Sequence, residues 1–144
     1  MKRIWTNGCY DILHIGHVRL FQYAKSLGDI LIVGIDSDER VKELKGNNRP
    51  FNNENTRKEI LLSNKYIDEV FIFNSSDDMC RIVQDCRIYT IVIGGEYSNR
   101  FTNPPVVAAN FVKELIFFPM VPNISTTKIL KYEENINNGK NSIT

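Results

Sequence analysis

The chain of 144 residues lacks several features that mark particular classes of protein. It has no apolar run of about 18 residues, the length that a membrane-spanning helix needs, so we expect no contact with a membrane. No apolar region long enough for a signal peptide follows the charged start of the chain, and residues 2–6 are interpreted as a first strand instead.

The chain has few cysteines, and its basic and acidic residues are nearly equal in number. The three cysteines, Cys9, Cys80 and Cys86, are an odd number without paired spacing, which argues against a disulfide framework and favours a reducing cytoplasm. The 18 basic and 17 acidic side chains give a net charge of +1, so the excess of positive charge typical of nucleic-acid-binding proteins is missing. Any anion that this protein binds must therefore be held by local groups.

Apolar strand-like runs alternate with helical segments along the chain. Strands are predicted over residues 2–6, 29–35, 69–73, 89–93 and 114–118. Helices are predicted over residues 17–27, 37–44, 54–65 and 77–86, and from Ser125 onward. This order predicts an α/β fold, a Rossmann-like doubly wound parallel five-stranded sheet in a single domain over residues 1–134. The Asn-rich residues 135–144 are expected to form a flexible polar tail.

The two histidines of the chain, His14 and His17, stand on either side of Gly16 where the first strand leads into a helix. A helix N-terminus offers backbone N–H groups and partial positive charge, and a glycine lets a phosphate approach the backbone closely. The pattern therefore predicts that both rings bind the phosphates of a nucleotide. Two ordinary surface histidines are the alternative. A zinc pair is a further one, but no cysteine or acidic cluster supplies more ligands, so no metal site is predicted.

Two motifs carry a resemblance to a known family. Residues 8–17, Gly-Cys-Tyr-Asp-Ile-Leu-His-Ile-Gly-His, resemble the signature of the cytidylyltransferase family, and residues 124–129, Ile-Ser-Thr-Thr-Lys-Ile, resemble its second signature at a helix start. The resemblance covers about residues 2–131. It implies a Rossmann-like fold and transfer of a nucleotidyl group from a nucleoside triphosphate to a phosphate monoester, with Mg²⁺ as cofactor and pyrophosphate as product. The family is commonly dimeric, so a homodimer is expected.

This chemistry needs no strong base, because the acceptor phosphate is itself an ionised nucleophile. The site must instead align two anions and stabilise charge in the transition state. Residues expected to bind the nucleotide are Asn7, Gly8, Cys9, Tyr10, Asp11, His14, Gly16, His17, Gly94, Glu96, Tyr97, Ser125, Thr126 and Thr127. Residues expected to be catalytic are His14, His17, Lys45, Arg57 and Lys128. The alternatives are a loop-capping role for Asp11, a helix cap for Ser125, packing on the sheet edge for Tyr97 and a solvated side chain for Lys128.

A basic segment follows the second predicted strand and is expected to bind the acceptor through Lys42, Lys45 and Arg49. Arginine offers a fork that matches phosphate geometry, and in the family a lysine before this loop and an arginine at the position of Arg57 contact phosphates. A solvated charged loop is the alternative.

The motifs divide between two branches of the family. Residues 8–11, 45–50 and 94–97 resemble the heptose-1-phosphate adenylyltransferase branch, the second domain of the bifunctional heptose enzymes. Residues 124–129 resemble glycerol-3-phosphate cytidylyltransferase, but the arginine that usually precedes them is absent from residues 120–123. The leading prediction is therefore ATP with a heptose-1-phosphate-like sugar phosphate, for activated-sugar or surface-polysaccharide synthesis. A CTP-dependent glycerol-3-phosphate or polyol-phosphate enzyme and a non-catalytic nucleotide-binding module are the alternatives.

Overall fold

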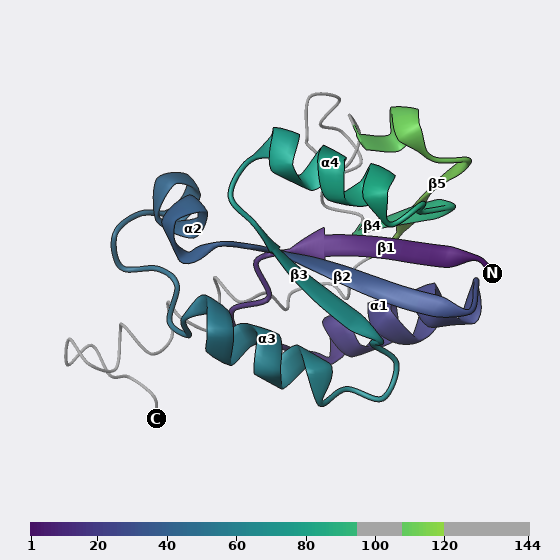
Figure 1. Cartoon of the computed structure of the whole chain (residues 1–144). Coiled ribbons are helices and arrows are strands. Elements are labelled where there is room, and N and C mark those ends of the chain that lie inside the picture. The colour runs from purple at the N-terminus through teal and green to yellow at the C-terminus, as the bar shows by residue number, and fades with distance from the viewer. Residues whose placement is uncertain (95–107, 120–144) are drawn as a thin grey trace.

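The computed structural model describes residues 1–94 and 108–119, and these form one sheet flanked by helices (Figure 1). In chain order the elements are β1 (Arg3–Gly8), α1 (Ile15–Ser26), β2 (Ile30–Asp36), α2 (Asp38–Lys45), α3 (Glu54–Leu62), β3 (Glu69–Phe73), α4 (Ser76–Asp85), β4 (Thr90–Gly94), the short 3₁₀ helix η2 (Ala109–Phe111) and β5 (Glu114–Phe118). The predicted helix from Ser125 and the predicted tail over residues 135–144 lie outside the described residues.

The five described strands form a parallel sheet in the order β3-β2-β1-β4-β5. The chain first moves from β1 outward to β3 and then returns to the other side of β1, so the winding reverses between β1 and β4. This order confirms the predicted doubly wound, Rossmann-like fold. In such sheets ligands bind beyond the carboxyl ends of the strands, next to the point of reversal.

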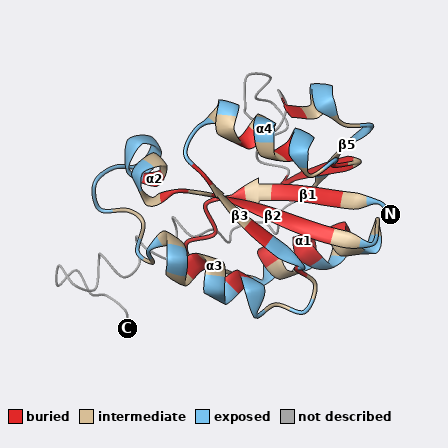
Figure 2. Ribbon diagram, in the orientation of Figure 1, coloured by how far each residue is buried: buried red, intermediate tan, exposed pale blue. Residues whose placement is uncertain are grey.

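Two apolar clusters cover the two faces of the sheet. On one face Ile4 packs with Phe21 of α1 and Leu61 of α3, and on the other Trp5 packs with Met79 of α4. Neighbouring residues of a strand point to opposite faces, so β1 contributes to both clusters. Helices cover both faces, which leaves residues 31–35 of β2 buried throughout, and Figure 2 shows this burial running along the strands.

The core is tightly packed around Gly34. A Cβ atom at this position would lie 2.2 Å from Cζ2 of the fully buried Trp5 ring. Only a residue without a side chain fits between β2 and this indole.

Three helices begin at a serine or asparagine whose side chain accepts a backbone N–H. Ser37 caps α2, Asn53 caps α3 and Ser75 caps α4, as is usual for these residue types. Two predicted helix boundaries were wrong by more than one residue. Helix α3 ends at Leu62 rather than at residue 65, because the poor helix formers Ser63 and Asn64 follow. Helix α1 begins at Ile15 rather than at residue 17. Among the described helices none is long and apolar enough to cross a membrane.

Candidate active site

The segments that follow β1 and β2 meet beyond the carboxyl ends of these strands. Residues 9–14 lead from β1 into α1, and α2 with the loop over residues 46–53 leads from β2 to α3. Gly94, the last residue of β4, ends at the same edge of the sheet. Figure 1 shows α2 projecting beyond this edge. The fold therefore brings the predicted histidine motif and the predicted basic segment to one place.

The two histidines form the start of α1. His14 is the N-cap residue, and its Nδ1 accepts a hydrogen bond from the Gly16 N–H at 3.1 Å. His17, three residues later, accepts the His14 N–H on its own Nδ1 at 3.2 Å. The rings stack with their centroids 3.8 Å apart and their planes 25° apart. This is a capping box in which histidines replace the usual Ser or Thr and Glu or Gln.

These hydrogen bonds define which ring nitrogen carries the proton. A neutral imidazole has one N–H donor and one bare nitrogen. Because Nδ1 accepts a hydrogen bond in both rings, the proton of each neutral ring lies on Nε2. Each ring can therefore present an Nε2–H donor while its Nδ1 stabilises the helix.

His17 is buried, and this keeps it neutral. Burial, together with the electrostatic effects of His14 and Lys45, lowers its pKa from 6.5 to about 3. The ring of Tyr10 meets it edge-on at a centroid distance of 5.2 Å. Tyr10 has a positive φ of 48°, and its ring lies 3.1 Å from the position that a Cβ on Gly8 would take. The Tyr10 ring thus packs between Gly8 and the His17 ring.

Asp11 connects residues 9–14, which lead into α1, to the basic segment through hydrogen bonds. Its fully buried carboxylate accepts the backbone N–H groups of Phe51 at 2.7 Å and Asn52 at 2.8 Å, and Nε of Arg49 at 3.3 Å. The Asn52 side chain donates to the Asp11 carbonyl at 2.9 Å. Asp11, predicted to bind the nucleotide, thus has both carboxylate oxygens occupied by protein donors, which agrees with its alternative loop-capping role. The importance of Asn52 had no local signal in the sequence.

Arg57 lies behind the site and has no exposed surface. Its guanidinium donates to the carbonyls of Cys9 at 3.0 Å, Asp36 at 2.8 Å and Asn52 at 3.0 Å, and to the Asp38 carboxylate at 2.8 Å. These four acceptors come from the ends of β1 and β2, the start of α2 and the loop before α3. In place of the predicted phosphate contact, the structure places Arg57 among protein oxygens, where it positions the surrounding loops.

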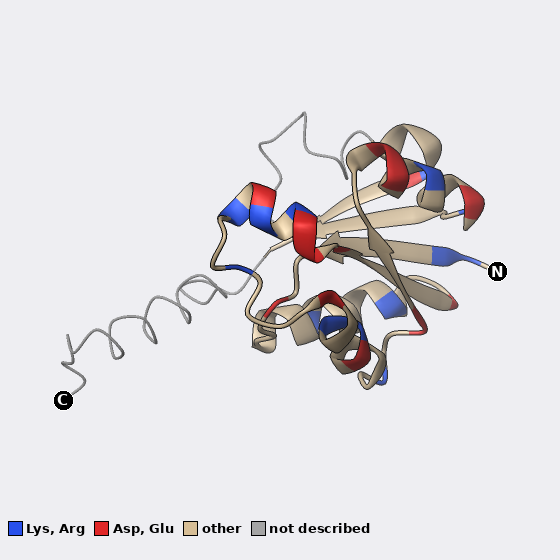
Figure 3. Ribbon diagram, turned by 60° about the vertical axis from the view of Figure 1, so that its left-hand side comes forward, with Lys and Arg blue, Asp and Glu red and all other residues tan. Residues whose placement is uncertain are grey.

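The remaining basic residues lie on and after α2. Lys42 and Lys45 are exposed at the end of this helix, where Figure 3 shows charged positions of both signs. Burial raises the pKa of the Cys9 thiol and of the Asp36 carboxyl, and the charge of Lys45 opposes both rises. Because Lys45 also lowers the pKa of His17, its ammonium group lies within electrostatic reach of the histidine pair.

Other predicted site residues have structural contacts or lie outside the described part of the chain. The Asn7 side-chain oxygen accepts the indole N–H of Trp5 at 3.0 Å. Gly16 donates its backbone N–H to the His14 ring. Six further predicted site residues lie outside the described residues: Glu96, Tyr97, Ser125, Thr126, Thr127 and Lys128.

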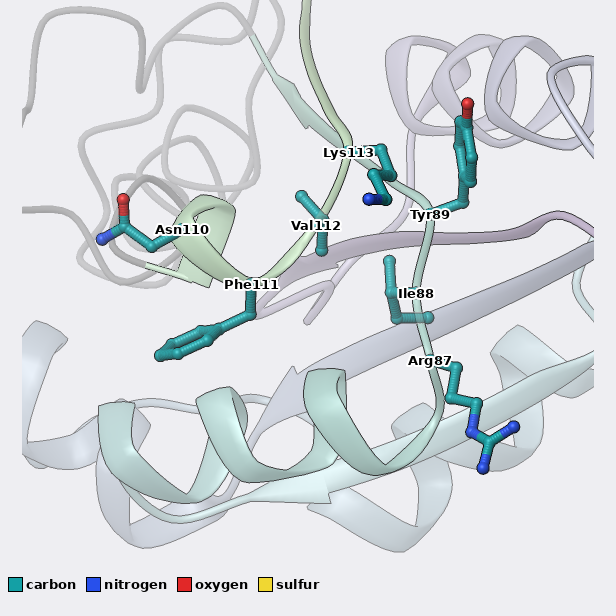
Figure 4. A pocket seen from close by; sticks show the side chains of 7 residues that line it. All are labelled: Arg87, Ile88, Tyr89, Asn110, Phe111, Val112 and Lys113. Carbon is teal, nitrogen blue, oxygen red and sulfur yellow. The ribbon is translucent and has the colours of Figure 1, made fainter.

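A hollow elsewhere on the molecule is separate from this edge. Figure 4 shows it between η2 and the residues that precede β4 and β5, at the amino ends of the strands. It is lined by Arg87, Ile88, Tyr89, Asn110, Phe111, Val112 and Lys113. None of the predicted site residues lines it.

Sequence comparisons identify related proteins over most of the chain. The family described as Cytidylyltransferase-like matches residues 5–132. The bifunctional protein HldE of Campylobacter fetus is 40% identical over 127 residues, which are 88% of this chain and 27% of HldE. HldE of Nitratiruptor is 42% identical over 131 residues, covering 90% of this chain and 27% of that protein. The chain thus spans about a quarter of the length of these curated relatives.

Structural comparisons find the same fold in more distant proteins. The lipopolysaccharide core biosynthesis protein from Thermoplasma volcanium is 23% identical, with a TM-score of 0.68 over 84% of this chain and 98% of that chain. Thermotoga maritima TmcAL bound with alpha-thio ATP is 11% identical, with a TM-score of 0.69 over 96% of this chain and 51% of that chain. At these identities the likeness concerns the fold.

Proposed function

Because the chain belongs to the cytidylyltransferase-like family of nucleotidyltransferases, we propose that it transfers the adenylyl group of ATP to a heptose-1-phosphate-like sugar phosphate. The choice of substrates is supported by the resemblance of residues 8–11, 45–50 and 94–97 to the heptose branch and by relatives named HldE at about 40% identity. The observation that carries the proposed chemistry is the histidine pair, whose rings are stacked and held at their Nδ1 atoms.

The proposed reaction is a substitution at the α-phosphorus of the triphosphate. An oxygen of the acceptor phosphate forms the new P–O bond, the bond to the β-phosphate breaks, and pyrophosphate leaves. Negative charge grows on the α-phosphate and on the leaving group, so the protein must supply fixed donors rather than a base. The Nε2–H groups of His14 and His17 are the proposed donors, and the neutrality of His17 keeps its proton in place throughout the reaction.

The basic segment supplies the cations for the second anion. Lys45 is placed to neutralise charge near the histidines, since its ammonium group is within electrostatic reach of His17. Lys42 is exposed on the same helix, and we propose that it attracts the acceptor. By the motif resemblance, Ser125, Thr126, Thr127 and Lys128 bind the β- and γ-phosphates, and Gly94, Glu96 and Tyr97 border the base.

The described residues fit Mg²⁺ only when the ion is bound together with the nucleotide. Among them no three His, Cys, Asp or Glu side chains lie together in a group that could hold a metal ion, and both oxygens of the Asp11 carboxylate accept protein hydrogen bonds. In nucleotide sites Mg²⁺ is commonly bound by substrate phosphates with one or two carboxylates and water. When bound, it neutralises phosphate charge. The homodimer and the cytoplasmic location stay predictions.

The test is a matrix of substrates read by pyrophosphate release. Each of the four common ribonucleoside triphosphates is combined with heptose 1-phosphate, glycerol 3-phosphate and other sugar phosphates. We expect the largest kcat/KM with ATP and the heptose ester. A clear preference for CTP and glycerol 3-phosphate would replace this assignment by the cytidylyltransferase alternative, and no release with any pair would leave a non-catalytic nucleotide-binding module.

A further inference from the structure

One donor on the Arg49 side chain lacks a partner. Among the described residues, Nη2 of Arg49 is the buried side-chain nitrogen or oxygen atom that makes no hydrogen bond. Buried polar groups are nearly always hydrogen-bonded, and an unpaired donor on a charged group costs more stability than one on a neutral group. The site is therefore complete only when an acceptor from outside the described chain meets this nitrogen.

The guanidinium is held in a fixed orientation from one side. Its Nε donates to the buried Asp11 carboxylate, and its backbone N–H donates to the Gly46 carbonyl at 3.2 Å. Asp11 in turn is fixed by the backbone N–H groups of Phe51 and Asn52, so it stays satisfied whether or not Arg49 moves. A guanidinium bound on one edge presents its remaining donors together, which suits the oxygens of a phosphate.

The topology indicates which substrate this donor meets. Arg49 belongs to the loop that follows β2 and α2, and β2 lies on the side of β1 away from β4. In doubly wound sheets the nucleotide lies at the reversal point, which is between β1 and β4 here. The segment that carries Arg49 and Lys45 thus lies on the side of β1 opposite the nucleotide.

We propose that Arg49 and Asp11 form one unit that selects the acceptor by its phosphate monoester. Arg49 contacts the phosphate through Nη2, and Asp11 is a positioning residue that acts through Arg49. This inference rests on the proposed function, because it names the acceptor subsite of the same reaction. This proposal assigns Asp11 to the acceptor subsite, whereas the sequence prediction placed it among the residues that bind the nucleotide.

Steady-state kinetics of Arg49→Gln test the contact. The KM for the acceptor is expected to rise about 10- to 100-fold, as for loss of a charged hydrogen bond, while the KM for ATP stays within about twofold. Arg49→Lys keeps the positive charge but lacks the two-pronged guanidinium, so its KM for the acceptor should lie between those of the parent and Arg49→Gln. Arg81→Gln is the matched control, since Arg81 is an exposed arginine of α4 that pairs with Asp78. An unchanged acceptor KM, or an equal rise of both KM values, would overturn the proposal, the second by placing Arg49 on the triphosphate.

A double-mutant cycle tests the positioning role of Asp11. Asp11→Asn alone should raise the acceptor KM, whereas in the Arg49→Gln background it should add less than about threefold, because residues acting as one unit are not additive. Additive effects would show that Asp11 does not act through Arg49. If Asp11→Asn fails to fold, as judged by circular dichroism, the Arg49 variants still decide the contact.

Calorimetric titration with heptose 1-phosphate separates this inference from the proposed function. Binding to the parent protein that weakens in Arg49→Gln supports the subsite even when no pyrophosphate is released, and in that case the proposed reaction alone fails. Equal binding by parent and variant, or no binding by the parent, overturns the subsite.

Discussion

The neutral state of His17 makes the stability of the protein depend on pH in a definite direction. The ring has a pKa of about 3 in the folded chain and 6.5 in the unfolded chain. Below pH 6.5 the unfolded chain takes up a proton that the folded chain does not accept. The contribution of His17 is therefore fully present above about pH 6.5 and is lost as the pH falls toward 3.

The size of this loss follows from the two pKa values. For one group it is about 1.4 kcal/mol at pH 5.5 and about 2.7 kcal/mol at pH 4.5, relative to neutral pH. A small domain has a free energy of unfolding of about 5–15 kcal/mol, so the change is large enough to measure. The raised pKa of Asp36 works in the opposite sense, which makes the parent protein alone a poor test.

Comparison with His17→Gln isolates the histidine. Glutamine is a usual residue at the third position of a capping box, so its side chain can still accept the His14 N–H while the titrating ring is gone. Urea unfolding of both proteins is measured at pH 7.5, 6.5, 5.5 and 4.5. The difference between their free energies of unfolding should shift against the parent by the amounts given above.

Two results would refute this reasoning. Parallel pH profiles for the parent and His17→Gln would show that the folded and unfolded states bind the proton equally. An NMR titration in which the His17 ring signals shift near pH 6.5 in the native protein would show that the ring is not held neutral.

Three further predictions concern other parts of the structure. Arg57→Met should lower the free energy of unfolding by about 3–5 kcal/mol, because it leaves the Asp38 carboxylate and three carbonyls without their donor; an unchanged urea midpoint would contradict the placement of Arg57. Gly34→Ala should cost about 1–3 kcal/mol by forcing Trp5 from its position, measured as a lower thermal midpoint, and a neutral effect would contradict the packing. Lys45→Gln should reduce kcat about 10²-fold with little effect on the thermal midpoint, since the side chain is exposed; full activity would exclude its catalytic role.

Much of the fold was readable from the order of its apolar segments. The apolar run over residues 29–35 indicated a strand covered on both faces, and alternation with helices indicated a parallel sheet; in the structure residues 31–35 are buried. The family prediction from the two motifs is confirmed by the match over residues 5–132. These features are visible because they depend on local pattern and on residues close in sequence.

The contacts behind the site could not be predicted in the same way. The start of α1 was placed at residue 17 from the spacing of its apolar residues, whereas the helix is capped from His14, and histidine is not a usual capping residue that would indicate this. Arg57 was expected to contact phosphate because an arginine at its position does so in the family that the motifs resemble, and the alternative was a solvated side chain, since charged side chains are rarely buried. Its burial depends on carbonyls that are far away in sequence, such as that of Cys9, and a single sequence contains no signal for such a meeting.

The contacts of Arg57 also close the base of the segment that carries the basic residues. One guanidinium binds Asp36 before α2, Asp38 at its start and Asn52 after it, so the segment over residues 39–51 begins and ends at the same point. A loop closed in this way can be exchanged or extended cheaply, since doubling its length costs only about 0.6 kcal/mol of closure entropy. The residues proposed to bind the nucleotide can thus stay the same while residues 39–51 are replaced by a segment that binds a different acceptor.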